Sequence, residues 1–276
     1  MALPWSTANR KAIGSSWSYA RDGGMGRAGG LPHHRFFVPG PLVEETTVAI
    51  DSLAPQLTGV LRLAPGASIL LLDGSGREFV ATVVVLSRHR ARAQIVSSHL
   101  NQAEPEFRLT LLQCTLKQDK FEWVLQKGTE LGIARFVPVI SERSIVRPLT
   151  AVRAKYERWH TILREAAEQS GRGRIPELAE PFEWLAAVRN LQGPGLVAWE
   201  EANSAPNLMH ALGAPADTVE QLSLAIGPEG GLTKAEVDAA EDSGWRRFTL
   251  GPRILRAETA AITAAALALS AAGDLG

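Results

Sequence analysis

Two patterns of hydrophobic and polar residues follow one another along the chain. From residue 35 to about residue 98, apolar and polar positions alternate with the period of β-strands, and turns rich in glycine and proline separate the runs. This pattern predicts a small β-rich module followed by a linker over residues 101–106. The expected strands are residues 35–38, 46–50, 68–72, 78–86 and 91–97, and one helix is expected over residues 53–63.

The pattern changes at Phe107. Short apolar runs now alternate with segments whose apolar residues recur at helical spacing, which is typical of an α/β domain. Thr233 and Glu236 have the spacing of a capping box, which marks the start of one helix. The expected strands are residues 108–114, 135–140, 196–199, 222–226 and 248–250, and the expected helices are residues 120–131, 151–169, 233–243 and 258–272.

Residues 1–34 fit neither pattern. They contain many glycines, scattered serines and arginines, and no apolar period, so we expect a disordered extension or an artefact of an upstream start codon. Residues 24–29 match the Gly-x-Gly-x-x-Gly motif of dinucleotide-binding proteins. No expected strand precedes this match and no expected helix follows it, so its context excludes that function.

Composition and charge narrow the class of protein. The formal net charge of zero argues against attachment to nucleic acid by overall charge, although a local basic face remains compatible with it. The single cysteine, Cys114, excludes an intrachain disulfide. The longest apolar stretch, residues 260–272, is mostly alanine and too short to span a bilayer. We therefore expect a cytoplasmic protein without a membrane segment, and the absence of metal-ligand spacing among His, Cys, Asp and Glu predicts no metal site.

Two glycine-containing loops are the strongest candidates for a ligand site. One runs from Ile226 to Leu232 and the other from Leu250 to Arg256, and each follows an expected strand and precedes an expected helix. Ligands of open α/β sheets bind at such junctions, where glycines let the backbone approach closely. The first loop lacks the Gly-Lys-Ser/Thr ending of a phosphate loop. An adenosine cofactor without a phosphate chain fits better, and the alternative is that both loops are only tight turns.

Several motifs together resemble one family. Arg-Phe-Phe occurs at residues 35–37, Gly-Pro-Glu-Gly-Gly at residues 227–231, and Arg-Ile-Leu-Arg-Ala-Glu-Thr-Ala at residues 253–260. Further matches are Val-Leu-Arg at residues 60–62, Lys-Gly-Thr-Glu-Leu-Gly at 127–132, Ser-Glu-Arg at 141–143 and Glu-Gln-Ser-Gly-Arg at 168–172. The chain from Arg35 onward resembles the RsmE family of bacterial 16S rRNA uridine-N3 methyltransferases, within the SPOUT class of knotted methyltransferases.

The resemblance implies the fold, the cofactor and the partners. It implies a PUA-like β-barrel RNA-binding domain over residues 35–104 and a SPOUT α/β domain with a deep trefoil knot over residues 105–276. It also implies a homodimer that uses S-adenosylmethionine to methylate N3 of a uridine in the decoding region of 16S rRNA, within the 30S subunit. The cofactor-binding residues implied are Ile226, Gly227, Glu229, Gly230, Gly231, Leu250, Gly251, Ile254, Leu255 and Arg256.

Arg256 and Glu258 are the candidates for catalysis. The uridine N–H must lose its proton as the methyl group arrives, and a cation stabilises the negative charge that develops on the ring. We assign that role to Arg256. Glu258 is the candidate for accepting the proton or orienting Arg256, and the alternative is that it complements the dipole at a helix start. The sulfonium methyl is already activated, so Cys114 need not act as a nucleophile.

The candidates for RNA contact are arginines that lie in matching motifs or expected loops. They are Arg35, Arg62, Arg143, Arg172 and Arg174. Two alternative functions remain at this point. One is a SPOUT enzyme that methylates another rRNA or a tRNA, and the other is a non-catalytic RNA-binding protein of ribosome assembly.

Overall fold

A computed structural model describes residues 34–191, 193–199, 205–212 and 220–275. The expected extension over residues 1–34 therefore lies outside the described residues except for His34. Within the described part, no helix is long and apolar enough to cross a membrane.

The first sheet has five strands. They are β1 (Arg35–Phe37), β2 (Thr47–Ala49), β3 (Ser68–Leu72), β4 (Arg77–Leu86) and β5 (Ala91–Leu100), in the spatial order β1-β3-β4-β5-β2. β1 pairs parallel to β3, and the other pairs are antiparallel. Alternate residues of these strands, such as Ile69, Leu71 and Ala81, point into a shared apolar core, as the period of two predicts.

A helical segment lies where one helix is expected over residues 53–63, but it runs over residues 51–60 and is irregular. It begins as a 3-10 turn at Asp51–Leu53, continues through two α-helical residues, and ends as a π-helical turn at Gln56–Val60. Pro55 lies in the first turns of this segment, where the N–H group that proline lacks is least needed.

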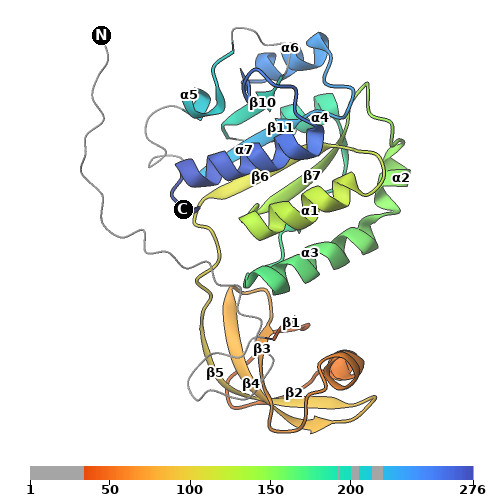
Figure 1. Ribbon diagram of the computed structural model, residues 1–276, viewed down its shortest axis with the longest axis vertical. Coiled ribbons are helices and arrows are strands. Elements are labelled where there is room, and N and C mark those ends of the chain that lie inside the picture. The colour runs from red at the N-terminus through yellow and green to blue at the C-terminus, as the bar shows by residue number, and fades with distance from the viewer. Residues whose placement is uncertain (1–33, 192, 200–204, 213–219, 276) are drawn as a thin grey trace, which may run out of the picture. The chain divides into compact units, whose positions relative to one another are not determined.

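The second sheet has seven parallel strands. They are β6 (Arg108–Cys114), β7 (Arg135–Ile140), β8 (Glu177–Leu178), β9 (Phe182–Glu183), β10 (Gly195–Ala198), β11 (Gln221–Ile226) and β12 (Arg246–Phe248). The order is β12-β10-β11-β6-β7-β8, with β9 also pairing with β7. Figure 1 labels β10, β11, β6 and β7 of this sheet. The α/β architecture expected for this part of the chain is confirmed.

Helices cover both faces of the second sheet. They are α1 (Lys120–Leu131), α2 (Leu149–Arg153), α3 (Tyr156–Ser170), α4 (Trp184–Asn190), α5 (Leu208–Leu212), α6 (Lys234–Asp242) and α7 (Ala257–Ala271). The cluster that contains Leu111 and Leu224 includes residues of α1, α2, α3, α5 and α7, whereas the cluster that contains Leu112 and Ala225 includes residues of α4 and α6. Neighbouring strand residues thus enter opposite cores, which explains the continuous apolar runs in the sequence.

The regular elements match the expectations best where the sequence period is strong. The capping box is present, because Glu236 N–H donates to Thr233 Oγ1 at 3.3 Å and Thr233 N–H donates to Glu236 Oε2 at 2.9 Å.

The single helix expected over residues 151–169 is wrong. The chain forms α2 and α3, and between them Lys155 N–H donates to the carbonyl of Val152 in a tight turn.

Other differences concern short elements. The last strand is β12 at Arg246–Phe248 and not residues 248–250. β8, β9, α4 and α5 were not expected. β8 and β9 have two residues each, which is too short for a sequence period to reveal.

We predict that Gly128→Ala destabilises the fold. This is the opposite of the usual effect, because alanine in a helix interior normally stabilises the helix by about 1 kcal/mol relative to glycine. Gly128 lies inside α1, and an added Cβ would stand 2.7 Å from Ile133 Cδ1 and 2.8 Å from the ring of Phe136. The overpacking should cost about 1–3 kcal/mol in free energy of unfolding, measured by urea titration. Gln126→Ala on the exposed side of α1 is the control, and equal stability of the two variants would contradict this prediction.

Candidate active site

The carboxyl ends of neighbouring parallel strands form one edge of the second sheet. β12, β10, β11 and β6 are adjacent, so the loops that follow them start side by side. A cavity of about 900 Å³ opens at this edge. Its walls are the chain after β10, the loops after β11 and β12, the first turn of α7, and Lys120 at the start of α1. This is the edge at which open α/β sheets bind ligands.

The cavity brings together nearly all of the cofactor-binding residues expected from the sequence. Those that line it are Ile226, Gly227, Glu229, Gly231, Leu250, Gly251, Ile254, Leu255 and Arg256. Gly230 is the exception, because it is not among the lining residues. Its carbonyl accepts a hydrogen bond from Arg143 Nη1 at 2.9 Å, so this glycine faces the loop that follows β7.

The loop after β11 turns sharply between the strand and the capped helix α6. Gly231 has a φ of +70°, an angle that residues with a Cβ rarely adopt. Its N–H donates to the carbonyl of Pro228 at 3.0 Å. Gln113 Nε2, from the end of β6, donates to the carbonyl of Gly227 at 3.4 Å. The loop is therefore held at both ends, which leaves its backbone positioned along the cavity.

The loop after β12 forms the opposite wall. Gly251 has a φ of +104°, and its N–H donates to Thr249 Oγ1 at 3.2 Å. The side chain of Ile254 is 89% exposed at this wall, an unusual position for a large apolar residue. Arg256 is the N-cap of α7 and has an extended backbone, which places it at the turn between loop and helix.

A charged cluster links α1 to the loop after β11 and to the first turn of α7. Lys120 Nζ lies 3.4 Å from Glu229 Oε1 and 3.8 Å from Glu258 Oε2. Burial alone would raise the pKa of Glu229, but the N–H groups of Lys117 and Glu229 and the Lys120 ammonium outweigh burial and hold this pKa below its ordinary value. Glu229 is therefore an anion at neutral pH. Lys120 was not among the residues expected at this site, because its only signal in the sequence is its place at the start of a helix after a strand.

Two buried polar atoms near the cavity have no hydrogen-bond partner among the described residues. One is Nε1 of Trp199, which lines the cavity and is 7% exposed, and the other is Oε2 of Glu258. Unpaired buried donors and acceptors are costly, and a polar ligand in the cavity would satisfy them. The cavity volume falls within the usual range for small-molecule and cofactor sites. The described residues contain no cluster of His, Cys, Asp or Glu that could hold a metal ion.

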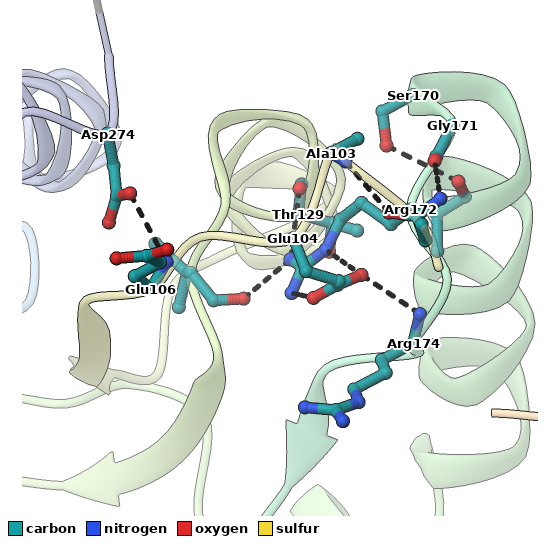
Figure 2. Close-up of polar contacts among 12 residues, drawn as sticks. Ala103, Glu104, Glu106, Thr129, Ser170, Gly171, Arg172, Arg174 and Asp274 are labelled. Atoms are coloured by element: carbon teal, nitrogen blue, oxygen red, sulfur yellow. Dashed lines mark hydrogen bonds and ion pairs between the residues drawn. The ribbon is translucent and has the colours of Figure 1, made fainter. Parts of the chain in front are cut away.

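The expected RNA-contacting arginines fall into two groups. Arg62, Arg143 and Arg174 are exposed, and Arg35 is half-buried beside Glu78, with 3.2 Å between Arg35 Nε and Glu78 Oε1. Arg172 is different, because only 3% of it is exposed and its guanidinium is fully engaged inside the protein (Figure 2). The expectation that Arg172 contacts RNA is therefore corrected: its burial gives it a structural role.

Models of two protein families match this chain. The RNA methyltransferase domain matches residues 103–269, and the RNA methyltransferase PUA domain matches residues 57–96. The ribosomal RNA small subunit methyltransferase E of a Synechocystis species is 34% identical over 231 residues, which are 83% of this chain and 74% of that protein.

Solved structures show the same relationship. The ribosomal RNA small subunit methyltransferase E of Neisseria gonorrhoeae, bound to S-adenosyl methionine, superposes with a TM-score of 0.77 at 33% identity, covering 86% of this chain and 97% of that one. A putative methyltransferase from Legionella pneumophila in complex with the same cofactor gives a TM-score of 0.79 at 29% identity, covering 87% and 98% of the two chains.

We predict that Cys114 does not react with thiol reagents in the folded protein. Complete burial raises the pKa of this thiol to about 12, so the reactive thiolate is not populated at physiological pH. A chromogenic disulfide reagent should label no thiol in the native protein and one thiol per chain in denaturant. Labelling of the native protein at the rate of a free peptide thiol would contradict the burial on which this prediction depends.

Proposed function

The chain belongs to the ribosomal RNA small subunit methyltransferase E family, and we propose that it transfers the methyl group of S-adenosylmethionine to N3 of a uridine in the decoding region of 16S rRNA. The observation that carries this proposal is the cavity at the carboxyl ends of β10, β11 and β12. Both of its principal walls are loops whose motifs resemble those of this family, and related structures are described as binding this cofactor.

The residues around the cavity fit the cofactor. The backbone groups of the loops after β11 and β12 are available for an adenosine and an amino-acid moiety, and Trp199 Nε1 is a donor without a partner among the described residues. Ile226, Leu250 and Leu255 supply apolar walls. When bound, the cofactor supplies an activated methyl group on a sulfonium centre. The protein then has to align the accepting nitrogen with this methyl group and to stabilise the negative charge that develops on the uracil ring.

Arg256 and Glu258 are the residues that stabilise the developing charge and accept the proton. Removing the proton from uracil N3 places negative charge on the ring, and Arg256, at the cavity wall, stabilises it with its guanidinium. Glu258 lies in the first turn of α7, and its Oε2, which has no hydrogen-bond partner among the described residues, is an acceptor for the N3 proton. Lys120 Nζ lies 3.8 Å from this oxygen.

We also propose 16S rRNA within the 30S subunit as the partner, a homodimer as the working state and the cytoplasm as the location. The exposed Arg62, Arg143 and Arg174 support the RNA partner, as does the PUA family match. The side chains of Trp123 on α1 and Leu267 on α7 are 42% and 37% exposed, and a subunit contact would cover them.

We predict that Arg256→Ala lowers the rate of methyl transfer by about 100-fold, which is typical for loss of one preorganised charge contact in a transition state. Cofactor affinity should change little, because the backbone contacts remain. Single-turnover methylation of 30S particles and calorimetry with the cofactor measure the two quantities. Arg253→Ala, in the same wall of the cavity, is the matched control. Equal rates for the two variants would remove Arg256 from the chemistry.

Glu258→Gln separates a chemical role from a structural one. If Glu258 accepts the proton, the variant loses rate and also loses the acidic limb of the rate–pH profile. If Glu258 only complements the helix dipole, the variant loses about 0.5 kcal/mol of stability and almost no rate. Single-turnover rates from pH 5 to pH 9, with mass spectrometry of the methylated nucleotide, distinguish these results. Methylation at a position other than uridine N3 would overturn the proposed function itself.

A further inference from the structure

The chain between the two sheets is fastened to the second sheet and its helices at three points. Asn101 Nδ2 donates to the carbonyl of Gly171 at 2.7 Å. Glu104 forms an ion pair with Arg172, and Asp274 accepts hydrogen bonds from the N–H groups of Glu106 and Phe107 at 3.2 and 2.8 Å. Figure 2 shows Glu104, Arg172 and Asp274 around the segment. Residues 101–106, where the sequence predicts a linker, are therefore held in place at both ends and in the middle.

The middle one of these contacts is the buried ion pair between Glu104 and Arg172, in which the charged groups also form hydrogen bonds to the backbone. Arg172 Nη2 lies 3.1 Å from Glu104 Oε2, and Arg172 Nη1 donates to the carbonyls of Ile133 at 2.8 Å and Thr129 at 3.2 Å. Glu104 Oε1 also accepts from the N–H of Arg174 at 2.9 Å. The side chains are 4% and 17% exposed. The planar fork of arginine makes this set of contacts, and the point charge of lysine would not reproduce it.

The same loop also touches the first sheet. Arg174 Nη2 donates to the carbonyl of Ser75, in the turn between β3 and β4, at 3.2 Å. A Cβ on Gly173 would stand 2.8 Å from Asn101 Cβ and 3.2 Å from the backbone of Gly76, so only glycine allows this approach. Nearby, Glu168 Oε1 on α3 accepts from the N–H of Phe37 on β1 at 2.7 Å. One short loop thus holds the linker and contacts the β-rich module.

We propose that Glu104 and Arg172 are positioning residues, which hold the β-rich module and the cavity as one preformed RNA-binding surface. This inference rests on the proposed function, because it assumes that both parts contact the same RNA. A substrate that spans two independently moving parts must immobilise them on binding, and a preorganised surface avoids that entropic cost. Arg172 therefore acts on RNA affinity from inside the protein without touching RNA.

The test compares Glu104→Ala with Glu122→Ala. Glu122 is a matched control because it also forms a two-pronged contact with an arginine, at 2.6 Å to Arg158 Nη2, but on α1 and away from the linker. Both changes remove one carboxylate, which is not itself an RNA ligand. For Glu104→Ala we expect the Kd for 30S particles to rise about tenfold. Cofactor affinity and the single-turnover rate at saturating 30S should stay at the wild-type values, and Glu104→Gln should restore part of the RNA affinity.

A second pair of variants tests the same idea without changing any charge. Gly173→Ala places a methyl group against Asn101 and should separate the loop from the β-rich module. Gly59→Ala, where an added Cβ meets nothing within 4 Å, is its control. Gly173→Ala should reproduce the weaker 30S binding with unchanged cofactor affinity, and it keeps the proposal testable if Glu104→Ala does not fold.

The outcomes separate this inference from the proposed function. Wild-type 30S affinity in a folded Glu104→Ala or Gly173→Ala variant would overturn the positioning role and leave methylation untouched. If the wild-type protein binds 30S particles and does not methylate uridine N3, the proposed function fails, and the affinity comparison still decides the role of the pair. Equal weakening by Glu122→Ala would also overturn the proposal, because the effect would then not be specific to the linker.

Discussion

The parallel arrangement of the second sheet is the constraint on which the site depends. Every strand of a parallel sheet ends at the same edge, so each connection must leave from that edge and return along a face. In this chain β12, β10, β11 and β6 are neighbours, and four separate segments begin within one region. The cavity follows from that geometry, because its lining residues come from several of these segments.

Charge at this edge is arranged by residues from different segments. Glu229 comes from the loop after β11, Glu258 from the first turn of α7, and Lys120 from the start of α1. Lys120 lies between the two carboxylates, and two further cations, Arg253 and Arg256, line the same cavity. The glycines of the loops therefore contribute shape, and charged residues of one loop and two helix starts contribute charge.

The sequence located the two loops that line the cavity because their signals are local. Gly231 and Gly251 stand where the backbone needs positive φ, and Thr233 and Glu236 mark the helix start that follows. Lys120 and Trp199 could not be found in this way, since their roles depend on strands that are distant in the sequence and adjacent in the sheet. Arg172 was misjudged for a related reason: an arginine beside glycines in a loop is usually exposed, and only the fold shows the carboxylate and carbonyls that bury it.

The order of strands in the second sheet also governs how the chain can fold. β11 lies between β6 and β10, so residue 108 finds its partner at residue 221. During synthesis β6 and β7 leave the ribosome with one edge unpaired, and that edge stays open until β11 arrives. Such long-range pairing slows folding and prolongs the time in which an exposed strand edge can meet other chains. The topology that gathers the cavity loops thus leaves one edge of β6 without its partner strand until β11 has been made.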